Sequence, residues 1–535
     1  MKRIFPTGSN WSILSILLIA GLALAACGAL ATPTAAAPPP GALAAATPPR
    51  PTVAPATGGT LRVALQADII ANQPHRLMET NFPWLLAVYD TLTRYDNNLV
   101  PQPILAEKWS WSADGKTLTV TLRKGVKFHS GRELTSEDVE LNFKHLDSGK
   151  AASQMKPLLN KITGFERPDA NTLVIRFKAP SPDFFDNTER MVIIDPKAID
   201  GIEDGAGPQV GTGPFVWKEW VAGSKLVLER NPNYWQAGQP TLDKIEYTIV
   251  PNREAMTLNL EAGSIDLIVT PDAKDVLRLK SNAKYTVIPS TNQTPTMYLG
   301  AYVKAKPLDD KRVRQALNYA MPRQRFADTI LLKLSEPNCL PWPKISPAYD
   351  EKLAKAYPYD LEKARSMLKD AGVQAGLAIN IEYNTGQKEL KEFAVLYEQE
   401  LTALGFKVTI EAVEPAVFST RNVNKQFKHL WLGVAEGAAL YPASILTMNN
   451  PWRAGNNTSD FRSDAFEDTV AKMSTELDPT KQKELFARAN QILIDESFNM
   501  PLTNQPYFWV STAKVTGFAF NKSNMIVFTK INVSK

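Results

Sequence analysis

The segment from residue 378 to residue 412 constrains the fold more than any other part of the chain. Ala378–Tyr383 and Phe406–Ala412 both have the pattern of strands, and Gly405 ends a helix between them. The apolar side chains of that helix recur at helical spacing: Leu390, Phe393, Ala394, Tyr397, Leu401 and Leu404. A strand, a helix and a second strand in this order predict a βαβ unit with parallel strands, because the helix carries the chain back to the start of the first strand.

The regions before and after this unit have different patterns. Before about residue 300, the alternating pattern of half-buried strands dominates. It recurs at Leu61–Leu65, Thr117–Leu122, Asn171–Phe177, Val216–Arg230 (two strands around a turn) and Tyr247–Val250. Helices dominate later, and Pro501–Phe528 is strand-like again. We expect this last stretch to complete a first lobe, so that two crossings connect two lobes as at a hinge.

The N-terminus has the features of an exported protein. Two basic residues precede the apolar run Ile13–Leu24, which leads through small residues to Cys27. This order predicts a secretory signal peptide over residues 1–26, and the run is too short for a membrane-spanning helix. Residues 27–57 are rich in Ala, Pro and Thr and predict an extended tether.

Composition argues against several classes of function. The net charge is +5 and falls to +3 without the signal peptide, which has two basic residues and no acidic one. This bias is too weak for a protein that binds nucleic acid. The cysteines are Cys27 and Cys339, so we expect no disulfide and no thiolate zinc site, with Cys339 as a small packed residue. The four histidines lack the spacing of metal ligands, and we predict neither a metal site nor a cofactor. They are His75, His129, His145 and His429.

The stretch Leu122–Val139 contains the residue types of a hydrolase site, including His129 and Ser130. These two are neighbours in sequence, so their side chains need not face each other as triad members do. Local structure accounts for the polar residues as well: Val126–Phe128 predicts a short strand, a turn follows, and Thr135 can cap a helix. The chain has no GxSxG elbow and no HExxH motif. We therefore predict that it is not an enzyme, with an exported hydrolase that uses two carboxylates as the rival interpretation.

Five motifs, in order, resemble a known family. The first, Ala106–Val139, reads AEKWSWSADGKTLTVTLRKGVKFHSGRELTSEDV. The other four are Val210–Phe215, Asn231–Trp235, Asp310–Ala320 and Tyr359–Ala364. Together they resemble the large solute-binding proteins of ABC importers, extracellular family 5, which includes oligopeptide, dipeptide and nickel binders.

This resemblance implies the fold and its division. The fold would be α/β and two-lobed, periplasmic-binding-protein-like (type II, cluster C-like), with a hinge and an inserted subdomain. The first lobe would comprise residues 58–98, 211–296 and 504–535, the inserted subdomain residues 99–210, and the second lobe residues 297–503.

The resemblance also implies a location and partners. The Leu-Ala-Ala-Cys sequence that ends at Cys27 is similar to a bacterial lipobox, which implies that Cys27 is lipidated and begins the mature chain. The protein would then be a monomeric receptor anchored by its lipid to the extracytoplasmic face of the cell membrane. It would deliver a small polar ligand to the permease and ATPase of an ABC importer.

Both lobes are expected to contribute ligand contacts. Trp84 follows the first strand in a loop, and Tyr298 and Tyr302 lie near the expected hinge. The stretch from residue 431 to residue 457 is rich in aromatic residues, Gly and Asn, and a neutral ligand would suit such a pocket. Its candidate contacts are Glu436, Ala438, Tyr441, Trp452 and Asn456.

The residue type at position 438 distinguishes between the possible classes of ligand. In peptide binders of the family an acidic residue pairs with the ligand's α-amino group, and alignment on Tyr441–Ser444 places Ala438 there. Either Glu436, two residues earlier, takes over this role, or the ligand has no free amine there. A peptide is the ligand that the resemblance favours, and an oligosaccharide or another non-peptide solute is the alternative, as is a sensory receptor on the same scaffold. Nickel is disfavoured by the scattered histidines.

Overall fold

The computed structural model describes residues 58–75, 80–149, 155–205, 207–269, 271–290, 295–435 and 440–534. Residues 54–535 form one compact unit. The predicted signal peptide, Cys27 and tether lie outside the described residues. Within the described part, no helix is both long enough and apolar enough to span a bilayer.

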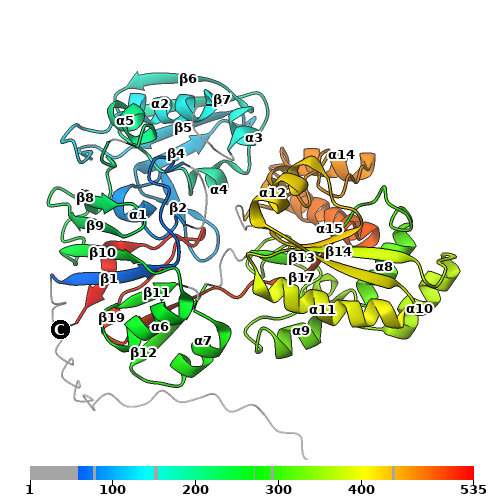
Figure 1. Ribbon diagram of the computed structural model, residues 1–535. Helices are drawn as coiled ribbons and strands as arrows, with labels where there is room; N and C mark the ends of the chain where they lie inside the picture. Colours follow the sequence, from blue (N-terminus) through cyan, green and yellow to red (C-terminus); the bar gives the residue numbers. More distant parts are fainter. Residues whose placement is uncertain are drawn as a thin grey trace, which may run out of the picture. The chain divides into compact units, whose positions relative to one another are not determined.

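The first large sheet has seven strands in the order β12-β18-β11-β1-β10-β9-β8. Strand β1 runs parallel to both of its neighbours, β10 and β11, whereas β18 is antiparallel to β11 and β12. Strand β18, close to the C-terminus, therefore returns to the sheet that β1 begins (Figure 1). The strands are β1 (Thr60–Leu65), β8 (Phe215–Val221), β9 (Lys225–Arg230), β10 (Lys244–Ile249), β11 (Leu267–Val269), β12 (Tyr285–Pro289) and β18 (Phe508–Thr512).

A second, four-stranded sheet is antiparallel in the order β4-β5-β7-β6. The alternation predicted for Thr117–Leu122 is confirmed, because Leu118, Val120 and Leu122 are buried and the threonines between them are half-buried. The buried side packs on α2 (Ser136–Asp147) through Val139 and Phe143. The strands are β4 (Ala106–Trp111), β5 (Thr117–Leu122), β6 (Ile162–Asp169) and β7 (Thr172–Phe177).

The third sheet has five strands in the order β15-β14-β16-β13-β17 and contains the predicted βαβ unit. Strands β14 and β15 are parallel, and the six apolar residues predicted for the helix between them are buried, apart from half-buried Leu404 just beyond its end. The prediction of this unit is therefore confirmed. The elements are β13 (Thr296–Ala301), β14 (Ala378–Asn384), α11 (Lys388–Ala403), β15 (Lys407–Val413), β16 (Leu430–Ala435) and β17 (Asn499–Asn504).

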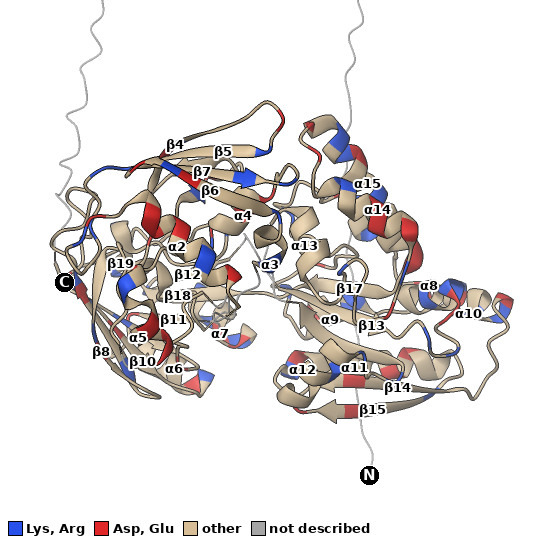
Figure 2. Cartoon of the chain, turned by 90° about the horizontal axis from the view of Figure 1, so that it is seen from above, with Lys and Arg blue, Asp and Glu red and all other residues tan. Residues whose placement is uncertain are grey.

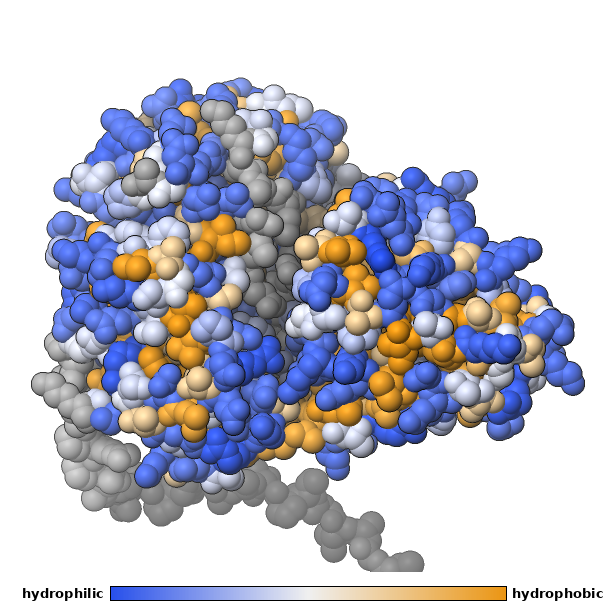
Figure 3. Space-filling model, viewed as in Figure 1, coloured by the Kyte–Doolittle hydropathy of each residue, from blue (hydrophilic) through white to orange (hydrophobic). Residues whose placement is uncertain are grey.

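The remaining elements surround these sheets. Short strand pairs are formed by β2 (Thr93–Tyr95) with β3 (Pro101–Pro103), and by β19 (Val515–Thr516) with β20 (Asn532–Val533). Lysines, arginines and acidic residues alternate along helices such as α14 and α15 (Figure 2), and most of the face in Figure 3 is hydrophilic. The other helices are α1 (Leu85–Val88), α3 (Lys156–Leu159), α4 (Phe184–Thr188), α5 (Ile199–Glu203), α6 (Arg253–Glu261), α7 (Ala273–Lys280), α8 (Lys311–Tyr319), α9 (Arg323–Thr329), α10 (Leu361–Asp370), α12 (Pro415–Asn424), α13 (Pro442–Met448), α14 (Asp464–Met473) and α15 (Pro479–Glu496).

The polar residues of the stretch Leu122–Val139 have structural partners. Ser130 Oγ donates to Asp195, and a ring nitrogen of His129 lies 3.0 Å from the carbonyl oxygen of Gly213. Asp138 accepts hydrogen bonds from the main chain and the hydroxyl of Thr135 at the start of α2, as predicted for a helix cap. The predicted short strand at Val126–Phe128 is wrong: a single bridge between Lys127 and Glu133 replaces it, because the turn leaves too few residues to pair.

Candidate ligand-binding site

The ends of parallel strands indicate where a ligand can bind. In open α/β sheets, ligands bind outside the carboxyl ends of the strands, where helices begin and the connecting loops are exposed. In the first sheet the parallel strands β1, β10 and β11 have their carboxyl ends at the same edge. In the third sheet the parallel strands β14, β15 and β16 do so as well. The connections that follow β10, β11 and β14 lead directly into α6, α7 and α11.

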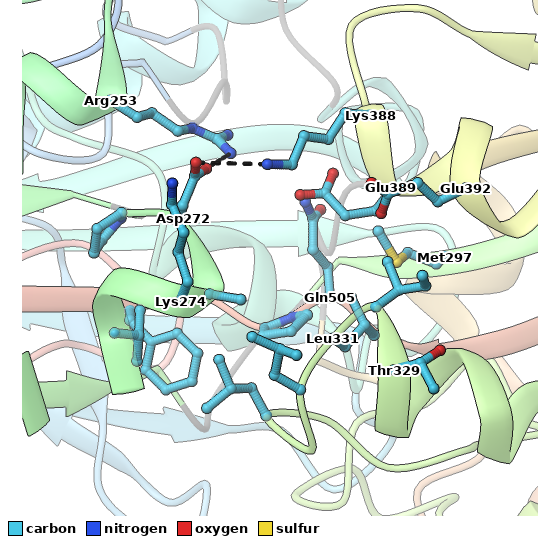
Figure 4. A pocket seen from close by; sticks show the side chains of 18 residues that line it. Arg253, Asp272, Lys274, Met297, Thr329, Leu331, Lys388, Glu389, Glu392 and Gln505 are labelled. Atoms are coloured by element: carbon cyan, nitrogen blue, oxygen red, sulfur yellow. Dashed lines mark hydrogen bonds and ion pairs between the residues drawn. The ribbon is translucent and has the colours of Figure 1, made fainter. Parts of the chain in front are cut away.

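These three connections line one cavity of about 240 Å³. Its wall includes the first residues of α6 and α11, Arg253 and Lys388, and the residues that lead into α7, including Asp272. The apolar part of the wall comes from Met297 on β13 and from residues after α9 such as Leu331. The cavity is thus built from elements of both the seven-stranded and the five-stranded sheet (Figure 4).

Charged side chains of both signs line this cavity. Asp272 lies between two cations: Oδ1 is 3.6 Å from Arg253 Nη1, and Oδ2 is 3.5 Å from Lys388 Nζ (Figure 4). Arg253 also donates from Nε to Gln66 Oε1, directly after β1, at 3.1 Å. Lys274, Glu389 and Glu392 complete the charged lining. Such a wall can hold a ligand that carries both an amino group and a carboxylate.

The polypeptide crosses between the two sheets beside this cavity. The segment after β17 leads through Gln505 into β18, and the segment before β13 ends at Pro295. Gln505 N donates to the carbonyl oxygen of Pro295 at 2.6 Å, so the two crossings are hydrogen-bonded to each other. The side chain of Gln505 also donates to Gln387 Oε1 at 3.2 Å, one residue before α11. Few residues separate the sheets here, which is the arrangement of a hinge.

Two further cavities are lined by residues near Ala435 and Leu440, respectively. One of about 530 Å³ is lined by Ala435 at the end of β16, by Asn449 and Arg453, and by Lys156 of α3. The other, of about 480 Å³, has Tyr441 in its wall. The predicted contacts Glu436 and Ala438 lie outside the described residues.

The structure places three of the predicted contacts in the core. Trp84 is fully buried, with its indole N–H donating to Asn81 Oδ1 at 3.2 Å and its ring against Trp217. Tyr298 and Trp452 are also buried, and their rings pack with centroids 5.3 Å apart. None of the three lines the cavities above, so a ligand role for them stays a prediction.

The other described candidates are more accessible. Tyr302 is half-buried, and its main-chain N–H donates to the carbonyl oxygen of His429. Asn456 is exposed and accepts from Arg453 Nε through its carbonyl oxygen. Tyr441 is half-buried and lines a cavity, and burial raises the pKa of its hydroxyl. Of the predicted contacts, Tyr441 is thus the one that the structure brings to a cavity wall within the described residues.

Sequence reasoning missed Arg253, Asp272 and Lys388. The available signal was positional: Arg253 and Lys388 each follow a predicted strand and stand at the start of a helix, where the strand-end rule expects ligand contacts. Asp272 follows β11, a strand that the sequence pattern did not indicate. Among the described residues, no group of three His, Cys, Asp or Glu side chains has the arrangement of a metal site. Within the described part of the chain, the buried thiol of Cys339 forms no disulfide.

The sheets, the paired crossings and the cavity between them define a two-lobed α/β solute-binding protein with a hinge and an inserted subdomain. The model of the bacterial extracellular solute-binding proteins, family 5, matches residues 100–457, and the chain belongs to this family. Its members are substrate-binding proteins that bind small-molecule ligands and work with an ABC permease, and this chain is such a substrate receptor for an ABC importer.

Individual relatives agree in length and fold. Di/tripeptide-binding protein 2 of Pseudomonas aeruginosa (strain UCBPP-PA14) is 25% identical over 465 residues, which are 81% of this chain and 86% of the relative. The glutathione-binding protein GsiB of Escherichia coli (strain K12) is 27% identical over 448 residues, 80% of this chain and 86% of the relative. The Helicobacter pylori periplasmic binding protein DppA, solved with the peptide STSA, superposes with a TM-score of 0.76 at 24% identity, covering 90% of this chain and 99% of that one.

Proposed function

We propose that this receptor captures a short peptide, or a peptide-like solute, in the cavity between its two sheets and delivers it to the permease by closing its lobes. The observation that carries the proposal is the cavity at the strand ends, where Lys388 and Arg253 approach one carboxylate of Asp272 from different sheets.

The charge pattern of this cavity suits a peptide. A short peptide carries an ammonium group at one end and a carboxylate at the other. The cavity offers three basic and three acidic side chains: Arg253, Lys274, Lys388, Asp272, Glu389 and Glu392. Hydrogen bonds in which one partner is charged contribute more than neutral ones. An oligosaccharide, the rival ligand, would use few of these charges.

Closure of the lobes follows from the presence of charged side chains on both sides of the cavity. A ligand shifts a two-state equilibrium only as far as it binds one state better than the other. A peptide whose ends contact Asp272 on one side and Lys388 on the other binds the closed state with both contacts and an open state with one. The permease can then distinguish loaded receptors by their closed form.

The division of the chain and its anchoring belong to the same proposal. The first lobe would hold the seven-stranded sheet, residues 99–210 the inserted subdomain, and residues 297–503 the second lobe. A lipid on Cys27, with residues 27–57 as a tether, would keep the receptor on the extracytoplasmic face of the membrane as a monomer. Mass spectrometry of the mature chain tests the anchor, since it predicts a diacylglyceryl group on an N-terminal Cys27.

The ligand class is tested by a thermal-shift screen combined with small-angle scattering. Trialanine and reduced glutathione are compared with maltotriose and a nickel–histidine chelate. We expect a peptide at a concentration 100 times its Kd to stabilise the folded state by about 2.7 kcal/mol and to reduce the radius of gyration. If maltotriose alone stabilises the protein, the ligand is an oligosaccharide and not a peptide. Stabilisation without a smaller radius of gyration would contradict closure of the lobes.

A further inference from the structure

Two side chains of the inserted subdomain reach main-chain atoms of the second lobe. Asp186 of α4 accepts a hydrogen bond at Oδ1 from Leu440 N at 2.9 Å. Lys161 donates from Nζ to the carbonyl oxygen of Ser474, the residue after α14, at 3.3 Å. The polypeptide itself passes between the sheets elsewhere, through the crossings beside Gln505. The two hydrogen bonds therefore join the subdomain to the second lobe at residues that belong to neither crossing.

The subdomain side of this contact is held together by Asp183, the residue before α4. Its Oδ1 accepts from Lys161 Nζ at 2.7 Å and from Ser181 Oγ at 2.8 Å. The side chains of Asp183 and Lys161 are 6% and 15% exposed. A buried ion pair with a second donor holds its members in one geometry. Because α4 carries Asp186 three residues after Asp183, the two groups that reach the second lobe are positioned relative to each other by bonds within the subdomain.

The second-lobe side of the contact is also held together. Tyr441 Oη donates to the carbonyl oxygen of Met473 at 3.2 Å. Tyr441 follows Leu440, and Met473 is the last residue of α14, directly before Ser474. One hydrogen bond within the second lobe thus connects the residues beside the donor and the acceptor that the subdomain uses.

A leucine adds an apolar contact between the same two parts of the chain. Leu477, in the connection from α14 to α15, lies against Gly115 in the turn between β4 and β5. A Cβ built on Gly115 would stand 2.4 Å from Leu477 Cδ1 and 3.3 Å from Pro180 Cβ. The glycine therefore leaves the space that Leu477 occupies. Since 47% of Leu477 is still exposed, this contact can separate without opening a core.

These contacts do not belong to the proposed ligand cavity. Among the described residues, those that line the cavity around Asp272 and Lys388 do not include Lys161, Ser474 or Leu477. Each hydrogen bond to the second lobe is exchanged for one to water when the two parts separate, so its net contribution is modest and the contact can form and break. A contact of this kind changes the ratio of closed to open molecules whether or not a ligand is present.

We propose that Lys161, Asp186 and Leu477 form a clasp between the inserted subdomain and the second lobe, which favours the closed receptor before a ligand arrives; this rests on the lobe closure proposed above. The three are positioning residues, because they act on ligand affinity through the fraction of receptors that are closed. The apparent affinity is the intrinsic affinity scaled by that fraction. Loss of the clasp therefore weakens every ligand by the same factor, whatever its chemistry.

The test measures amide hydrogen exchange at Leu440 in the ligand-free protein, by mass spectrometry with fragmentation. Lys161→Met removes the donor to Ser474 and leaves the Leu440 N–H and its acceptor unchanged. If the contacts open together, this substitution speeds exchange at Leu440 roughly tenfold, because exchange follows the population of the open form. Lys472→Met is the matched control: Lys472 on α14 pairs with Asp468 at the surface, and its loss should leave the exchange rate unchanged.

A second variant separates the clasp from local unfolding of the subdomain. Lys161→Met also leaves Asp183 without its cation, so exchange in β5 and β7 is followed in the same experiment. Leu477→Ser removes no buried charge and should speed exchange at Leu440 about twofold or more. Its control, Leu258→Ser on α6, alters a leucine that is 60% exposed and should not.

If β5 and β7 lose protection in Lys161→Met, the comparison of Leu477→Ser with its control decides. The clasp is overturned if Leu440 of the wild type exchanges as fast as an unprotected amide. It is also overturned if the deciding variant exchanges no faster than its control.

Trialanine and reduced glutathione provide the arm with ligand. Calorimetric titration should show that Lys161→Met weakens both peptides by the same factor, roughly tenfold at most. Weakening of one peptide alone would assign Lys161 to a ligand contact and reject the clasp. If neither peptide binds the wild-type protein, the peptide function fails, and the exchange measured without ligand still decides about the clasp.

Discussion

Lys388 Nζ lies 3.5 Å from Asp272 Oδ2, so the first residue of α11 is paired with the residue that precedes α7. Asp272 follows a strand of the seven-stranded sheet, and Lys388 follows a strand of the five-stranded sheet. Arg253 approaches the other oxygen of the same carboxylate at 3.6 Å. One carboxylate therefore has a cation on each side, and a ligand group that enters the cavity can exchange with either of them.

Lys388→Gln is expected to weaken peptide binding while leaving the ligand-free protein nearly as stable. The Lys388 side chain is 61% exposed, so its ion pair contributes less than about 1 kcal/mol to the free energy of unfolding. As a donor to a ligand carboxylate it is worth more, and its loss should lower the affinity for trialanine roughly tenfold or more. Calorimetric titration measures the affinity, and urea unfolding measures the stability.

Lys391→Gln, an exposed position one turn further along α11, is the matched control for that experiment. It removes the same charge from the same helix and should leave affinity unchanged. Equal effects of the two substitutions would mean that the lysines act only through the net charge of the lobe, and the assigned role of Lys388 would be withdrawn.

Gly213→Ala is expected to destabilise the protein strongly. A Cβ at Gly213 would overlap the carbonyl carbon of Val88 and lie 2.6 Å from the Tyr89 nitrogen, and both are main-chain atoms that cannot move aside. Forcing atoms into such a contact costs about 1–3 kcal/mol or more in unfolding free energy. Gly164→Ala, where no atom lies within 4 Å of the added Cβ, should change stability by less than about 1 kcal/mol. Urea unfolding compares the two, and similar losses would contradict the steric explanation.

The fold was predictable from the sequence where local periodicity decides it. The βαβ unit from residue 378 to residue 412 is confirmed because strand and helix patterns change there within a few residues. Strand β14 and helix α11 bury most of their apolar residues, and Val408 and Ile410 of β15 are half-buried. The strand expected at Val126–Phe128 is wrong because a short run says nothing about whether a partner strand is within reach. The sequence shows the residue pattern of a strand, but it does not show which partner strand is within hydrogen-bonding reach.

The candidate site was less predictable because it depends on tertiary contacts. Arg253, Asp272 and Lys388 are far apart in sequence, and nothing local distinguishes them among 60 basic and 55 acidic residues. Trp84 and Trp452 show the opposite problem: an aromatic residue beside a turn can face a ligand or the core, and only the packing decides. Tyr441 differs from them because its side chain reaches a cavity wall.

Glu411→Gln should lower stability at neutral pH and have no effect in strong acid. The hydrogen bonds from Lys428 and Arg421 lower the pKa of Glu411 to about 2. The ionised form is therefore favoured by folding, and its contribution is present above the ordinary pKa of 4.5 and disappears as the pH falls through about 2. Since Lys428 is 62% exposed, the contribution is only about 1 kcal/mol. Urea unfolding of the wild type and the variant across this range should give curves that converge in acid, and a constant difference would contradict the assignment.

Glu189→Gln should change the pH dependence at the opposite end of the range. The wild type should lose stability as the pH rises, and the variant should not. Burial raises the pKa of Glu189 from 4.5 to about 8, so the folded protein holds a proton that the unfolded chain has released. The stabilisation is complete below pH 4.5 and is lost as the pH rises through about 8. Glutamine keeps the acceptor for the main-chain N–H of Lys522 but cannot ionise. The stability of the wild type relative to the variant should therefore fall by a few kcal/mol at most between about pH 5 and pH 9. Parallel curves would show that Glu189 is already ionised in the folded protein, and that Arg190 compensates its charge despite their burial.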